Sequence, residues 1–146
     1  MAVIVRIALM SAVVSGLACA GSTSRGADGE RSAEATPRKV AVSVTYRERI
    51  MVPSGSELDV RVVDATKSDS AATTVAQSKS KITGGPPYQV SLTVPPELFI
   101  DSSRYEARAS IMRPDSTVMF ETASGVPVLT MGAGDSVEVI VSMGER

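Results

Sequence analysis

The chain has 146 residues, with 15 Lys and Arg against 16 Asp and Glu, a formal net charge of −1, and no His, Trp or Asn. Without His it lacks the usual general base, the base of the common nucleophile triads and the ligand of most zinc sites. Without Asn it has no N-glycosylation site. No basic face stands out in the sequence, so we expect no nucleic-acid binding.

Residues 1–20 have the pattern of a lipoprotein-type signal peptide. Arg6 is the only charged residue, and the apolar run 7–14 follows it. The whole segment is shorter than the roughly 20 apolar residues that a membrane span needs. We therefore expect the protein to be exported.

Two cleavage sites remain open at the end of this segment. Cleavage before Cys19 would leave a lipidated cysteine whose acyl chains, such as palmitate, anchor the protein stably. Cleavage after Ala20, at the A-x-A pattern 18–20, would leave a soluble protein without cysteine. Gly16 departs from the larger aliphatic residue usual in a lipidation site, but a lone cysteine where a signal ends favours lipidation at Cys19. In either case a single Cys excludes a disulfide within the chain.

Residues 21–38 are small, polar and charged, and they lack aromatic residues. Such a segment cannot bury enough apolar area to offset the entropy of ordering, so we predict a disordered tether. The remaining residues, 39–146, are enough for one small domain with a single core.

Apolar residues alternate with polar ones through residues 39–146, which predicts strands. No segment of ten or more residues has a strong helical period. Val118 and Phe120 are expected on one face of their strand. Pro127 lies between Val126 and Val128 and predicts an edge strand at this position. The sequence therefore predicts an all-β fold, a single Ig-like or prealbumin-like β-sandwich of seven or eight strands. The predicted strands cover residues 40–46, 58–62, 72–82, 88–94, 105–111, 118–120, 126–128 and 137–141.

Tyr105 stands at the start of a predicted strand, directly after the turn 101–104. This placement is typical of a tyrosine corner, in which the phenol bonds back to the backbone and fixes a crossover between sheets. An ordinary core tyrosine is the alternative, and both interpretations are structural.

No residue is a convincing catalytic, metal or cofactor site. Residues 78–81 match the pattern S-x-x-K, but in an extended segment residues three apart point to opposite faces, so we expect a solvated edge strand. Glu57 and Asp59 share a strand face and fit a surface charge ladder better than a carboxylate pair in a cleft. Three aspartates at turns are explained by turn formation rather than by calcium binding; they are Asp101, Asp115 and Asp135.

Two segments are candidates for binding a partner. Arg47 and Arg49 form one face of the distinctive stretch 46–49, which is either a docking patch or a set of cross-strand pairs with Glu57, Asp59 and Asp64 on the next strand. Val126 and Val128 lie in the predicted edge strand and are the second candidate.

Five segments in this order resemble the YbaY family of bacterial lipoproteins, which includes the type III secretion pilotin YscW. They are VTYRERI at 44–50, VPSGSEL at 52–58, VRVVD at 60–64, YEARASI at 105–111 and PVLTMGAGDSV at 127–137, and the resemblance spans about residues 39–142. It implies a β-sandwich on the periplasmic side of a Gram-negative envelope, usually lipidated, with no catalytic residues. Cys19 matches the position of the family's lipidated cysteine, and Ala20 after it favours the outer membrane.

The sequence thus predicts an envelope-anchored periplasmic lipoprotein whose β-sandwich is structural or binds protein, and not an enzyme. In its sharper form, the prediction is a pilotin-like chaperone for an outer-membrane secretin. The alternative is a soluble periplasmic module that binds a small molecule or a glycan, although two Phe, three Tyr and no Trp offer few stacking platforms. The partner, the oligomeric state and the involvement of a secretion system stay open.

Overall fold

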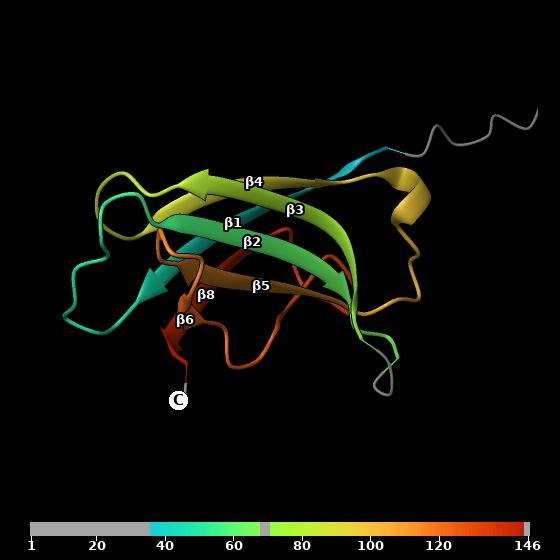
Figure 1. The fold of residues 1–146 in the computed structure, drawn as a ribbon. Coiled ribbons are helices and arrows are strands. Elements are labelled where there is room, and N and C mark those ends of the chain that lie inside the picture. Colours follow the sequence, from blue (N-terminus) through green and yellow to red (C-terminus); the bar gives the residue numbers. More distant parts are fainter. Residues whose placement is uncertain (1–35, 68–70, 145–146) are drawn as a thin grey trace, which may run out of the picture. The chain divides into compact units, whose positions relative to one another are not determined.

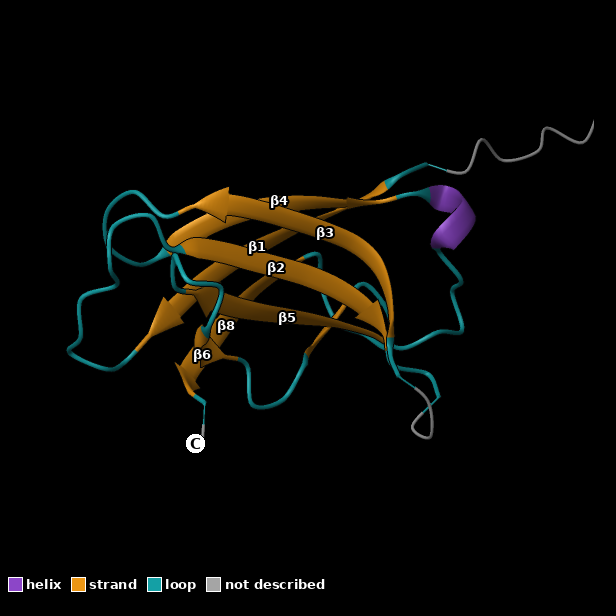
Figure 2. Cartoon of the chain, viewed as in Figure 1, coloured by secondary structure: helices purple, strands orange, loops and turns teal. Residues whose placement is uncertain are grey.

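The structure is a computed structural model that describes residues 36–67 and 71–144. The predicted signal peptide, Cys19 and most of the predicted tether lie outside these residues. Within them the chain forms strands and one short 3-10 helix, η1 (Figures 1 and 2). The elements are β1 (Arg38–Tyr46), β2 (Glu57–Asp64), β3 (Thr73–Lys81), β4 (Tyr88–Val94), η1 (Pro96–Leu98), β5 (Tyr105–Met112), β6 (Val118–Glu121), β7 (Val126–Val128) and β8 (Ser136–Met143).

The strands follow the order β3-β2-β5-β6-β8-β1-β4, and β7 pairs with the first residues of β5. All pairings in this order are antiparallel except that of β1 with β8. The two end strands of the order, β3 and β4, lie close together, so the sheet curls almost into a closed form (Figure 1). The predicted all-β sandwich of seven or eight strands is confirmed.

The interior is filled by the residues that the period of two places inward. Val40, Val42 and Val44 of β1 are fully buried, and β-branched side chains of this kind pack well on a pleated surface. Phe120 and Tyr105 are the largest fully buried side chains. The other fully buried apolar residues are Val60, Val62, Val94, Ala107, Ile111, Val128, Val139 and Val141.

Tyr105 forms the tyrosine corner. Its buried hydroxyl accepts a hydrogen bond from the Ile100 N–H (2.9 Å) and donates one to the Leu98 carbonyl (3.0 Å). Its ring stacks on Phe99 with 5.4 Å between centroids, and the Arg38 guanidinium lies 5.0 Å from the centroid of the Phe99 ring. The corner thereby fixes η1 and the segment after it to the beginnings of β5 and β1.

The expectation that Val118 and Phe120 share one face is wrong. Val118 is exposed, whereas Met119 and Phe120 are both buried. The register between β5 and β6 shifts between Ile111 and Met112, so that one extra residue stands on β6. A β-bulge of this kind moves the following side chain to the other face of the sheet, and strict alternation in the sequence does not reveal it.

Candidate partner-binding groove

An open groove of about 400 Å³ lies at one end of the sandwich, beyond the last residue of β1 and the first residue of β2. Two loops enclose it, 47–56 and 82–87, at the left of Figure 1. The Ile82 N–H donates to the Ser56 carbonyl (2.9 Å) and so joins the two loops. The lining residues are Tyr46, Met51, Val52, Pro53, Ser54, Ile82, Gly84 and Gly85.

Two tyrosines support the groove from the strand side. Tyr46 is stacked on Phe120 at 4.8 Å between ring centroids, which couples the groove to the core. Tyr88 lies at the start of β4, with its hydroxyl 3.4 Å from the Gly84 carbonyl. Burial, together with the neighbouring Tyr46, raises the pKa of Tyr88 to about 12, so its hydroxyl stays neutral at physiological pH.

Met51 is the most exposed large apolar side chain of the described residues, at 90 % exposure, and Ile50 beside it is also exposed. A flexible, polarizable thioether adapts to the surface of a bound partner. Apolar side chains held together at an open surface are typical of sites for protein contact. The groove and Met51 therefore form a site of mixed apolar and polar surface that suits a segment of another protein.

Arg47 and Arg49 lie on the same loop as Met51, and both are exposed. Between them, Glu48 accepts hydrogen bonds from the Arg47 N–H (3.1 Å) and from the Met143 N–H of β8 (3.3 Å). The alternative expectation, cross-strand pairing with the acidic residues of β2, is wrong because β1 pairs with β4 and β8 and not with β2. Two exposed arginines thus belong to the loop that forms one side of the groove.

Val126 and Val128 are not brought to this groove. β7 pairs with residues 105–107 at the beginning of β5, whereas the groove lies near Glu57, which pairs with the last residue of β5. Val128 is fully buried and Val126 partly buried. The Val128 side chain therefore packs in the core and cannot contact a partner.

Sequence reasoning missed Met51, Ile82 and Tyr88. The signal for Met51 was an apolar pair, 50–51, placed between charged residues and Pro53 where no strand was predicted. Ile82 and Tyr88 belong to neighbouring predicted strands, and their meeting depends on how the loop between them folds.

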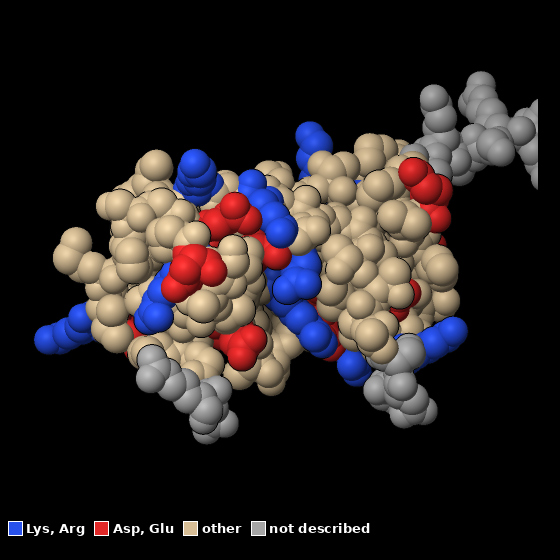
Figure 3. All heavy atoms as spheres, viewed as in Figure 1, with Lys and Arg blue, Asp and Glu red and all other residues tan. Residues whose placement is uncertain are grey.

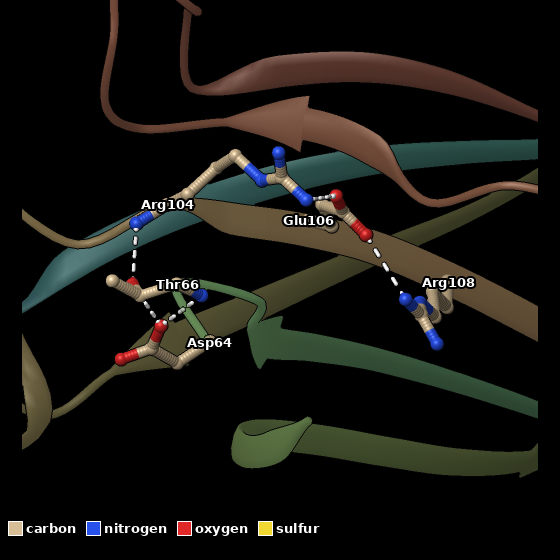
Figure 4. Close-up of polar contacts among 5 residues, drawn as sticks. All are labelled: Asp64, Thr66, Arg104, Glu106 and Arg108. Atoms are coloured by element: carbon tan, nitrogen blue, oxygen red, sulfur yellow. Dashed lines mark hydrogen bonds and ion pairs between the residues drawn. The ribbon is translucent and has the colours of Figure 1, made fainter. Parts of the chain in front are cut away.

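Two buried carboxylates on the outer face of β2 and β5, Asp59 and Glu106, already have polar partners, and Figure 4 shows those of Glu106. Glu106 lies between Arg104 (3.1 Å) and Arg108 (3.0 Å). Asp59 accepts from Gln77 through both oxygens (2.8 and 3.0 Å) and is 3.7 Å from the Arg61 Nε. Acidic and basic side chains are interspersed over this face in Figure 3.

The other predicted features have structural explanations. The S-x-x-K residues, 78–81, lie in the extended strand β3 at one end of the sheet order, as expected. Asp115 accepts from the Thr117 N–H (3.0 Å) in a turn. Within residues 36–67 and 71–144, no three His, Cys, Asp or Glu side chains lie close enough to hold a metal ion. The same part of the chain contains no helix of the length and hydropathy needed to cross a membrane.

The comparisons with known proteins agree with the predicted resemblance. A family model described as "Type III secretion system lipoprotein chaperone (YscW)" matches residues 35–141. Among solved structures, an alternative pilotin from the type II secretion system of Vibrio cholerae matches with a TM-score of 0.67 and 27 % identity over 75 % of this chain and 100 % of that one. No match was found among curated proteins. Because the family model covers most of its length, the chain belongs to the YscW family of type III secretion system lipoprotein chaperones.

Proposed function

We propose that this protein is a pilotin that binds a segment of an outer-membrane secretin subunit in the groove beside Met51. The observation that carries the proposal is the 90 % exposure of Met51 at the edge of a groove that Val52 and Ile82 also line, in a chain of a secretion-chaperone family. A segment bound in this groove would cover all three apolar side chains together, and grouped apolar side chains of this kind mark sites of protein contact.

The groove also indicates the chemistry of the segment. Apolar side chains fit against Met51, Val52 and Ile82, and carboxylates fit Arg47 and Arg49 at the rim. Opposite charges across an interface steer association and fix its register more than they add affinity. The proposed ligand is therefore a short amphipathic segment with acidic residues along one side.

The proposal also includes the location of the complex in the cell envelope. Acyl chains on Cys19, with Ala20 after it, would hold the domain at the periplasmic face of the outer membrane. Intact mass spectrometry of the membrane fraction tests this part: a mass that fits acylated Cys19 supports it. A mass that begins at Gly21 in the soluble fraction contradicts it.

Site-specific photocrosslinking in the native bacterium tests the groove. The full chain carries p-benzoylphenylalanine at position 51 or, as a matched control, at position 131. Met131 is also strongly exposed, at 78 %, but it follows β7 at the other end of the strands. We expect a crosslink to a secretin subunit from position 51 and none from position 131.

A second measurement counts secretin multimers in the outer membrane. Met51→Asp places a charge in the apolar contact, and removing one good hot spot costs about tenfold or more in affinity. We expect fewer multimers with Met51→Asp and an unchanged number with the matched variant Met51→Leu, which keeps an apolar side chain at this position. If Met51→Asp assembles secretin normally and position 51 crosslinks no secretin, the groove is not the binding site.

A further inference from the structure

A second set of exposed apolar side chains lies at the end of the sandwich opposite the groove. Leu98 is 46 % exposed, Ile100 57 % and Met131 78 %. We call this region the corner end, because the tyrosine corner lies beneath it. The groove does not use these side chains, and the buried core does not include them.

Hydrogen bonds hold the corner end together across distant parts of the chain. The Ser103 N–H donates to the Ile100 carbonyl (3.0 Å), and the Thr130 hydroxyl donates to the Ser103 carbonyl (2.7 Å). Met131 directly follows Thr130. The three apolar side chains therefore project from two loops that are bonded to each other.

Tyr105 fixes the backbone on both sides of Phe99, since its hydroxyl bonds Leu98 and Ile100. The Phe99 side chain turns inward onto the Tyr105 ring. Leu98 and Ile100 consequently point outward from a fixed support, and little further ordering is needed when they bind.

The chain comes into the domain at this same end. Arg38, the first residue of β1, contacts Phe99, and Figure 1 shows η1 beside the beginning of β1. Residues 20–37 separate Arg38 from Cys19. Even fully extended, this stretch of chain reaches at most about 60 Å. An anchor on Cys19 would then keep the corner end at high effective concentration beside the bilayer.

Charges around the corner end balance: four cations accompany four anions. They are Arg38, Lys39, Lys67 and Arg104 with Asp64, Glu97, Asp101 and Asp135. Anionic headgroups therefore gain little here, and the apolar side chains must supply the attraction.

We propose that the corner end rests on the lipid bilayer, with Leu98 and Ile100 inserted at its interface and Met131 beside them. The inference rests on the anchor at Cys19 in the proposed function. It adds an orientation: the corner end faces the membrane, and the groove, at the other end of the strands, faces the periplasm and the secretin.

The test measures the membrane depth of single labelled positions. Full-length acylated chain with Ile100→Cys or Met51→Cys is reconstituted in vesicles of phosphatidylethanolamine and phosphatidylglycerol. Because Cys19 is blocked by its acyl chains, an environment-sensitive dye reacts with the new thiol alone. We expect nitroxide lipids to quench the dye at position 100 at least about threefold more than at position 51, with little dependence on salt.

Equal, weak quenching at both positions would overturn the inference. So would a dye at position 100 that is shielded from water but not quenched by lipid, because a second copy of the chain would then cover the corner end. If the intact mass shows no acyl chains, a hexahistidine tag placed ahead of residue 21 and a nickel-chelating lipid replace the anchor. The difference in lipid quenching between positions 100 and 51 then tests the inference in the same way. Failure of secretin binding is read separately, by the crosslink from position 51.

Discussion

The two ends of the sandwich differ in how their loops are held. At the corner end, Tyr105 bonds two backbone groups, Thr130 bonds Ser103, and the Ala65 N–H donates to the Arg104 carbonyl (2.8 Å). At the groove end, the loops 47–56 and 82–87 leave Met51 in solvent. The loops of the corner end are thus held by buried side-chain hydrogen bonds, whereas the groove loops are joined through the backbone bond from Ile82 to Ser56 and an exposed contact of the Tyr88 hydroxyl. We therefore expect the corner end to be the more rigid of the two.

The largest expected effect is that of Tyr105→Phe. The variant keeps the ring but leaves the Ile100 N–H and the Leu98 carbonyl without their buried partner, which costs about 2–4 kcal/mol of unfolding free energy. Tyr88→Phe is the matched change at the groove end, where the hydroxyl lies 3.4 Å from the Gly84 carbonyl and close to Tyr46 in a solvent-exposed site, and we expect a loss under about 0.5 kcal/mol. Urea unfolding of both variants measures the difference. Equal losses would mean that the corner does not brace the fold.

Two glycines, Gly125 beside Glu106 and Gly85 in a groove loop, allow the packing at the two regions to be compared. Gly125 lies against Glu106, and a Cβ on it would meet the Glu106 Oε2 at 2.1 Å and the Glu106 Cβ at 2.7 Å. Gly125→Ala must push this side chain away from Arg104 and Arg108, at a cost of about 1–3 kcal/mol. At the groove end, a Cβ on Gly85 meets nothing within 4 Å, so Gly85→Ala should change stability by less than about 0.5 kcal/mol.

Thermal unfolding followed by circular dichroism measures both glycine variants. Unfolding temperatures that fall together would contradict the assignment of tight packing to Glu106 and Gly125. A lower unfolding temperature for Gly85→Ala alone would mean that the groove loops are the more tightly packed.

The strands could be predicted because alternation and β-branched residues act locally. The inward positions of β1 and β2 follow directly from the period of two, and Tyr105 could be identified as a corner candidate because the turn before it is local too. The neighbours of β1 could not be predicted, because its pairing with β8 joins residues about 95 apart in the chain. This is why pairing of Arg47 and Arg49 with β2 was a wrong alternative.

The groove escaped prediction for a related reason. Met51 stands in a loop, and a loop residue has no periodic pattern that says whether its side chain is buried. The bulge at Met119 likewise leaves no local mark, since it depends on the register with β5. Sequence patterns predict elements well, whereas sites formed by loops from several elements depend on tertiary contacts.

The smallest expected effect concerns two matching turns, one at each end. Asp64 accepts hydrogen bonds from the N–H and the hydroxyl of Thr66, and Asp115 accepts the same pair from Thr117. These bonds, the hydroxyl bond foremost, lower the pKa of each carboxyl. A lowered pKa in the folded state adds stability above the unfolded pKa of about 4, and this stability is lost as the pH falls through the folded pKa.

Of the two turns, that of Asp64 is also hydrogen-bonded to another segment, because the Thr66 hydroxyl accepts from the Arg104 N–H (2.9 Å) at the corner end (Figure 4). We therefore expect Asp64→Asn to cost more at pH 7 than Asp115→Asn, although solvent limits the loss at Asp64 to about 0.5 kcal/mol. In each variant the difference in unfolding free energy from the unmodified chain should shrink as the pH falls from about 5 through the folded pKa of the carboxyl, as measured by urea unfolding. A difference at Asp64 that stays constant while the pH falls would assign the effect to the geometry of the turn and not to the charge of its carboxylate.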